Sequence, residues 1–109
     1  MQSLGSFKRG DTFSFVARLK DKTGAVVTLP ADKISCDIRT ERYALVAELT
    51  VTQHPTEVGS YIFTAIPLVT KTFPLGVVLL DIEMNSSGEI TSTETFSATI
   101  VKDVTNYGE

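Results

Sequence analysis

The stretch Phe13-Ser14-Phe15-Val16-Ala17-Arg18-Leu19 decides the fold, because an apolar side chain occupies every second position along it. The same two-residue period recurs over residues 34–38 and 45–51. Successive side chains of an extended strand point to opposite faces, so this period places one apolar face on a core and one face toward water. The pattern predicts antiparallel β-strands.

Outward from that stretch, alternation and turn residues divide the chain into seven predicted strands. Asp21-Lys22-Thr23-Gly24 and Asn85-Ser86-Ser87-Gly88 have the composition of tight turns, and residues 68–72 are expected to form one helical turn. The predicted strands cover about 12–20, 25–28, 34–40, 43–53, 60–66, 77–84 and 89–101. Short strands at this spacing predict an all-β fold, an immunoglobulin-like antiparallel β-sandwich of about seven strands.

The length of 109 residues suits a single domain with one core. Residues 1–11 are small and polar except for Phe7, and we expect them to form an extended N-terminal arm. The sandwich itself is predicted to occupy residues 12–105.

Charge excludes some classes of partner. The net charge is −3 with both signs interspersed, and the absence of a basic stripe argues against nucleic acid or a membrane as partner. The longest apolar run, 77–80, is far too short to span a bilayer. No secretory signal is visible at the N-terminus, so we expect synthesis in the cytoplasm.

No set of residues in the sequence predicts catalysis, a metal or another cofactor. Cys36 lies between Ile34 and Ile38 on an apolar face, where a buried thiol is expected. His54 is the only histidine and cannot by itself define a catalytic triad or a metal site. Asp81 and Glu83 share a face of their strand, where solvated charges are the ordinary interpretation. We expect a protein that is not an enzyme.

Some apolar side chains lie on outward strand faces, where an isolated sandwich would not require them. Val77 and Leu79 fall on the outward face of the strand at 77–84. The same two-residue alternation places Val16 and Val46 on the outward faces of their own strands. Apolar residues on both faces of one strand indicate that something covers the outer face. The cover is either the N-terminal arm through Phe7 or a neighbouring subunit, and Phe7, Val77 and Leu79 are the predicted subunit contact.

The order of several short motifs resembles a known family. Phe7-Lys8-Arg9-Gly10-Asp11-Thr12-Phe13 leads into the first strand, Asp21-Lys22-Thr23-Gly24 forms a turn, and Thr72-Phe73-Pro74-Leu75-Gly76 precedes Asp81-Ile82-Glu83. The chain closes on Phe96-Ser97-Ala98-Thr99-Ile100-Val101-Lys102-Asp103-Val104-Thr105. From about residue 7 to 105 this order is similar to the Ig-like tail and baseplate proteins of tailed bacteriophages and prophages, notably the N-terminal domain of the siphophage baseplate upper protein family.

That resemblance implies a non-enzymatic virion component, assembled in the host cytoplasm, that acts as a structural or adaptor protein. Its partners would be other virion proteins, and further copies of the chain in a homo-oligomer. The alternative is a carbohydrate-binding or adhesin-like sandwich, which requires aromatic side chains exposed on one face or on clustered loops. The aromatic residues available for such a site are Tyr43, Tyr61, Phe73 and Tyr107.

Overall fold

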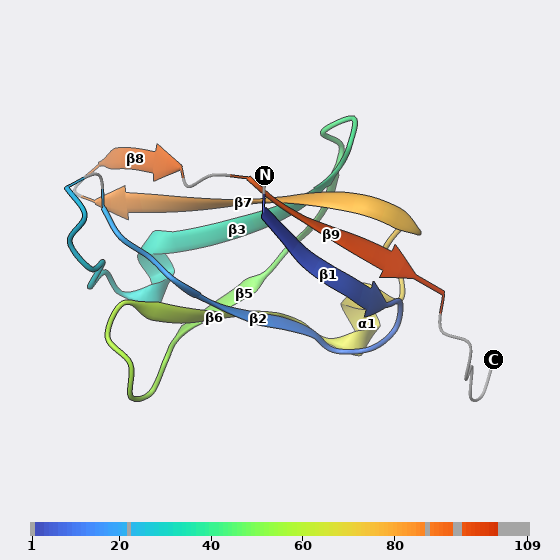
Figure 1. Cartoon of the computed structure of the whole chain (residues 1–109), viewed down its shortest axis with the longest axis horizontal. Coiled ribbons are helices and arrows are strands. Elements are labelled where there is room, and N and C mark those ends of the chain that lie inside the picture. Colours follow the sequence, from blue (N-terminus) through green and yellow to red (C-terminus); the bar gives the residue numbers. More distant parts are fainter. Residues whose placement is uncertain (1, 22, 87, 93–94, 103–109) are drawn as a thin grey trace.

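The computed structural model describes residues 2–21, 23–86, 88–92 and 95–102, which fold into two facing sheets (Figure 1). The larger sheet has the order β1-β9-β7-β3-β4, and β8 also pairs with β7. The smaller sheet has the order β2-β6-β5. This is the two-sheet arrangement of an immunoglobulin-like sandwich, so the predicted fold class is confirmed.

The strands account for most of the described residues. In the larger sheet they are β1 (Gln2–Lys8), β3 (Ile34–Thr40), β4 (Leu45–Glu48), β7 (Gly76–Ser86), β8 (Glu89–Ser92) and β9 (Phe96–Val101). In the smaller sheet they are β2 (Phe13–Arg18), β5 (Thr50–Gln53) and β6 (Ser60–Ala65). The helical elements are the 3₁₀ turn η1 (Ala31–Lys33) and α1 (Pro67–Thr70).

The core lies between the sheets and is built from the predicted alternating residues. Phe13 and Phe63 of the smaller sheet are buried opposite Ile38 and Leu80 of the larger sheet. Phe73, from the loop after α1, fills the same core and meets the Phe13 ring edge-on at 6.1 Å between centroids. Burial of aromatic rings of this size supplies much of the apolar stabilisation of a small domain.

The predicted strand over 43–53 is wrong, because the chain changes sheets in its middle. Leu49 is buried and its N–H donates to the carbonyl of Cys36 on β3, at 2.9 Å. The residues before it pair with β3 as β4, and those after it pair with β6 as β5. Alternation continues through the crossing, so the sequence pattern carries no mark of it.

Two other predicted strands also differ from the structure. Residues 25–28 form no strand, and only a single bridge joins Lys20 to Val26. The segment 89–101 is divided into β8 and β9, which pair with successive parts of β7; residues 93–94 lie outside the described residues. The described residues therefore contain nine strands.

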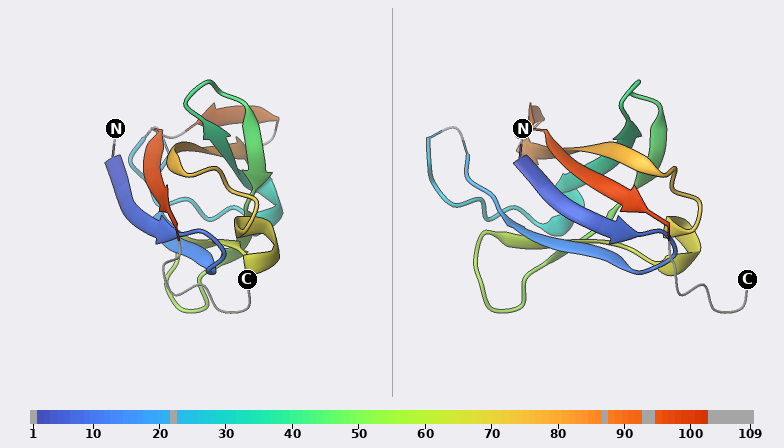
Figure 2. Two further views of the ribbon diagram at one scale, coloured as in Figure 1. Left: turned by 90° about the vertical axis from the view of Figure 1, so that its right-hand side faces the viewer. Right: turned by 45° about the vertical axis from the view of Figure 1, so that its right-hand side comes forward.

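The expected N-terminal arm is extended, but Gln2–Lys8 lies within the larger sheet rather than outside the sandwich. It pairs in parallel with β9, with Phe7 opposite Ile100, and the two strands run side by side in both views of Figure 2. Phe7 packs on Phe13, with 4.3 Å between ring centroids. Residues 2–11 thus supply an edge strand and a part of the core.

The segment between β2 and β3 crosses from one sheet to the other and is held by a buried tyrosine. The Tyr61 hydroxyl donates to the carbonyl of Leu29 at 2.5 Å, and Gln53 Nε2 donates to the same oxygen at 3.2 Å. Gly59 lies beneath this segment in the left-handed region (φ +86°), where a Cβ would lie only 2.0 Å from Val26 Cγ1.

We expect Gly59→Ala to lower the free energy of unfolding by about 2–4 kcal/mol, from left-handed strain together with the clash against Val26. Gly24→Ala is the matched control, since Gly24 has the same φ of +86° and nothing within 4 Å of its Cβ position. It should cost only about 1–2 kcal/mol. Urea unfolding of both variants measures the difference, and equal losses would contradict the close approach.

Candidate functional site

The candidate site is the outer face of the larger sheet, defined by the outward side chains of β7 and its neighbours. Val78, Leu80 and Ile82 point into the core, so the alternate residues Val77, Leu79, Asp81 and Glu83 point outward. Register aligns Leu79 with Arg39 of β3 and Ser97 of β9, and Arg39 with Leu45 of β4.

Apolar side chains on this face differ greatly in exposure. Leu79 is only 8% exposed, because the strands on both sides place Arg39 and Ser97 beside it. Val77 is 41% exposed and Leu45 is 54% exposed. Neighbours within the chain therefore cover the predicted contact residue Leu79, whereas Val77 and Leu45 remain accessible to a partner.

Charged groups lie among and beside the apolar side chains of this face. The Arg39 guanidinium donates to Asp37 Oδ2 at 3.2 Å and to the carbonyl oxygen of Tyr43 at 3.1 Å. Asp81 Oδ1 accepts a hydrogen bond from the Thr95 hydroxyl at 2.6 Å. Asp81 and Glu83 share this face as predicted, and the bond from Thr95 gives Asp81 a structural partner.

Phe7 is not on this face. Its register partner Ile100 is buried in the core, and its ring stacks obliquely on Phe13 between the sheets. The structure therefore brings Val77 and Leu79 together but places Phe7 on the opposite side of the sheet. Val46 is also not outward: the register shift in the pairing of β3 with β4 turns it toward the core, while Val16 is 56% exposed as predicted.

Tyr43 is a surface feature that alternation did not identify. It sits in the β3–β4 turn with a φ of 64°, the sole non-glycine residue of the described chain with a positive φ, and it is exposed. The Thr40 hydroxyl accepts hydrogen bonds from the N–H groups of Arg42 and Ala44 and fixes this turn. A non-glycine residue held in this region carries strain of about 1–3 kcal/mol.

The aromatic residues that a carbohydrate site would use are not gathered on one surface. Tyr61 and Phe73 are both about 1% exposed and belong to the core. Tyr43 is exposed at the β3–β4 turn, and Tyr107 lies outside the described residues.

His54 has a structural role in the β5–β6 loop. Its Nδ1 accepts hydrogen bonds from the N–H groups of Thr56 and Glu57 at 3.3 and 3.0 Å. The Ser60 hydroxyl donates to Glu57 Oε1, and this bond is the main cause that lowers the pKa of the Glu57 carboxyl. In the part of the chain that the structure describes, no group of three or more His, Cys, Asp and Glu side chains is placed to hold a metal ion.

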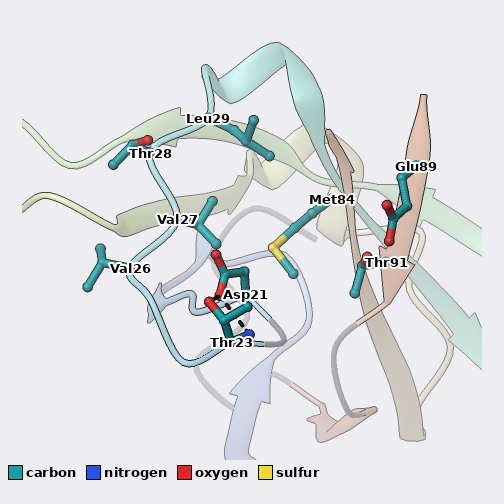
Figure 3. Close-up of a pocket in the computed structure, with 9 residues that line it drawn as sticks. All are labelled: Asp21, Thr23, Val26, Val27, Thr28, Leu29, Met84, Glu89 and Thr91. Carbon is teal, nitrogen blue, oxygen red and sulfur yellow. Dashed lines mark hydrogen bonds between the residues drawn. The ribbon is translucent and has the colours of Figure 1, made fainter. Parts of the chain in front are cut away.

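A cavity of about 290 Å³ opens between the loop after β2 and the β7–β8 hairpin (Figure 3). Two carboxylates, hydroxyl groups and apolar side chains line it. They include Asp21, Thr23, Val27, Met84, Glu89 and Thr91. Asp21 Oδ1 accepts hydrogen bonds from the Thr23 hydroxyl and from the Thr23 and Ala25 N–H groups, and the bond from the hydroxyl is the main cause that lowers the pKa of this carboxyl.

Neither a family model nor a curated protein matches the sequence. Solved structures that resemble the chain include CopC from Methylosinus trichosporium OB3b, at 17% identity and a TM-score of 0.48 over 71% of this chain and 70% of that one. Another is the N-terminal Ig1-2 module of the Drosophila receptor protein tyrosine phosphatase DLAR, at 18% identity and a TM-score of 0.49. That match covers 94% of this chain and 46% of the module, so this chain spans less than half of the module's length.

None of the described helices has the length and apolar character needed to cross a bilayer.

Cys36 provides a test of the core. Burial, with smaller contributions from the charges of Asp37 and Asp81, raises the pKa of its thiol from 9.0 to about 12. We expect less than about one hundredth of the reactivity of a free thiol toward a disulfide reagent at pH 8, because the thiolate is the reactive form. Full reactivity should return in 6 M guanidinium chloride. Rapid labelling of the folded protein would contradict the buried position.

Proposed function

We propose that this protein is a non-enzymatic structural or adaptor protein of a phage or prophage tail or baseplate, and that it acts through protein–protein contacts. The observation that carries the proposal is the outer face of the larger sheet, where Val77 on β7 and Leu45 on β4 are exposed. Apolar positions on a strand that already has a complete inward face are suited to a partner surface.

The composition of this face supports a protein partner. It combines apolar side chains with Arg39, which lies between Leu79 and Leu45 and is paired with Asp37, and a mixture of apolar and arginine side chains is common in protein interfaces. Tyr43 and Arg39 are of the residue types that contribute most to binding energy at such interfaces. Because β7 is hydrogen-bonded along both edges, the face is held rigid and loses little conformational entropy on binding.

The particle context rests on the resemblance of motif order over residues 7–105 to Ig-like tail and baseplate proteins. A rigid sandwich of this kind presents the same face from every copy in a particle. Repetition makes modest individual contacts sufficient, because each further contact is intramolecular once the first has formed.

The test uses the protein expressed with a tag in its native host, followed by prophage induction and gradient purification of particles. We expect the wild-type protein to sediment with tail or baseplate particles. Val77→Lys combined with Leu45→Lys should reduce its incorporation by about tenfold or more, because two charges would be buried at the contact.

Val16→Lys is the matched control, since Val16 is similarly exposed but lies on the smaller sheet. It should be incorporated like the wild type. Absence of the wild-type protein from purified particles would overturn the particle assignment. Normal incorporation of the Val77 and Leu45 variant would overturn the assignment of the outer face.

A further inference from the structure

The strand β2 has one side on which no other strand of the described chain pairs with it. It stands at the end of the smaller sheet, whose order is β2-β6-β5. Its pairing with β6 runs from Phe13 to Arg18 without any shift in register. The preceding strand β1 joins the larger sheet instead, and the two strands diverge from the loop between them (Figure 1). The position beside β2 is therefore open to a further strand.

Backbone donors and acceptors face this open side. The N–H of Leu19 donates to the carbonyl of Gly59, just before β6, at 2.8 Å. Because hydrogen bonds of an antiparallel pair recur at every second residue, the odd-numbered residues of β2 direct their N–H and C=O groups toward β6. The same groups of Ser14, Val16 and Arg18 point to the open side, and all three residues are exposed.

The side chains of β2 do not protect this edge. Natural sheets block free edges with charges, proline or bulges. The only charged residue of β2 is Arg18 at its end, and the strand contains neither proline nor a bulge. On the outer face Val16 is 56% exposed, and on the inner face Phe15 and Ala17 are only partly buried. A strand added here would cover apolar side chains on both faces of β2.

The other sheet edges of the described residues are less suited to pairing. The register of β1 shifts between Ser3 and Ser6. The strand β4 has four residues, pairs with β3 through a register shift and ends in Glu48. The 3₁₀ turn η1 packs beside β5. The strand β8 has four residues and begins with the charged Glu89. The edge of β2 thus combines regular backbone with an uncharged centre.

We propose that two copies of this chain pair through β2 in antiparallel orientation, so that their smaller sheets form one continuous sheet. A second copy is the occupant because β2 is complementary to itself. With the two-fold axis at Val16, that residue lies opposite its own counterpart, and Ser14 lies opposite Arg18. Each arginine therefore faces a hydroxyl group rather than another cation, and apolar side chains meet at the centre.

This register also satisfies the open backbone groups. Ser14, Val16 and Arg18 all fall at hydrogen-bonded positions, which gives about six bonds between the two copies. On the inner face, Phe15 of one copy lies opposite Ala17 of the other, so a large side chain meets a small one. The contact area is small, and the association is accordingly weak and reversible.

The first test uses a cysteine on the two-fold axis. The thiol of Cys36 is buried, so Val16→Cys introduces an accessible thiol into a chain that otherwise has none. Residues opposite each other at a hydrogen-bonded position have Cα atoms about 5.5 Å apart, which suits a disulfide. We expect Val16→Cys to form covalent dimers under mild oxidation, read on a non-reducing gel.

Thr52→Cys is the matched control. Thr52 is exposed on β5 and lies in the same cross-strand row, since Ile62 of β6 is the register partner of both Thr52 and Val16. In the paired sheet the two Thr52 residues are five strand spacings apart, about 24 Å. Val16→Cys should therefore crosslink at least about tenfold faster. Equal rates would overturn the proposal.

The second test changes the charge opposite Arg18. Ser14→Glu should strengthen the dimer about fivefold and Ser14→Lys should weaken it about fivefold, because each dimer contains two such cross-strand pairs. Both variants lose the 3.3 Å hydrogen bond between the Ser14 and Thr64 hydroxyls, so they differ only in charge. Sedimentation equilibrium measures the two dissociation constants. Shifts in the same direction would contradict the antiparallel register.

Val16→Lys and the Val77 and Leu45 lysine variant separate this proposal from the preceding one. Val16→Lys places two cations opposite each other at the axis, so it should abolish pairing. It should still enter particles, because the outer face of the larger sheet is unchanged. The Val77 and Leu45 variant should pair like the wild type and fail to enter particles.

The pairing does not depend on the particle assignment. Wild-type protein that is absent from particles but crosslinks through Val16→Cys would leave the pairing supported and remove only the particle assignment. A wild type that stays monomeric at about 1 mM would overturn the pairing, and so would undiminished dimerisation of Val16→Lys.

Discussion

Burial of one face of β7 against the smaller sheet is the interaction on which the rest of the structure depends. Val78, Leu80, Ile82 and Met84 form that face, and β3, β8 and β9 all hydrogen-bond to the same strand. Once this face is fixed, the two-residue period also fixes which side chains point outward. The position of Leu79 and Val77 on the outer surface is thus a direct consequence of core packing.

Alternation predicts a strand well where the strand stays in one sheet. β3, β6 and β7 are such cases, and their buried residues match the predicted apolar positions. It fails at Leu49, where the chain passes from the larger sheet to the smaller one without any break in the pattern. It also fails for β1, whose side chains do not alternate regularly and whose pairing with β9 depends on contacts across nearly the whole chain. Local pattern contains no information on such distant partners.

The candidate site was predictable only in part, for a similar reason. The two-residue alternation along β7 assigns Val77 and Leu79 to the outer face, but the neighbouring strands determine how exposed these side chains are. Arg39 and Ser97 cover Leu79, and these neighbours follow from strand order rather than from local sequence. Phe7 was predicted to be a surface contact but lies in the core, and its position there depends on the parallel pairing of β1 with β9. The left-handed backbone of Tyr43 follows from the hydrogen bonds of Thr40 in a turn, which apolar periodicity does not report.

The parallel pairing of β1 with β9 has a consequence for the order of folding. Gln2 lies opposite Phe96, so the N-terminal strand has no sheet partner until the strand at the far end of the domain has been synthesised. In a ribosome-bound nascent chain the smaller sheet can form early. At that stage Phe7 of β1 still lacks its neighbours on β9. β1 can join the larger sheet only after translation of β9, and the apolar surface that β1 covers stays exposed until then.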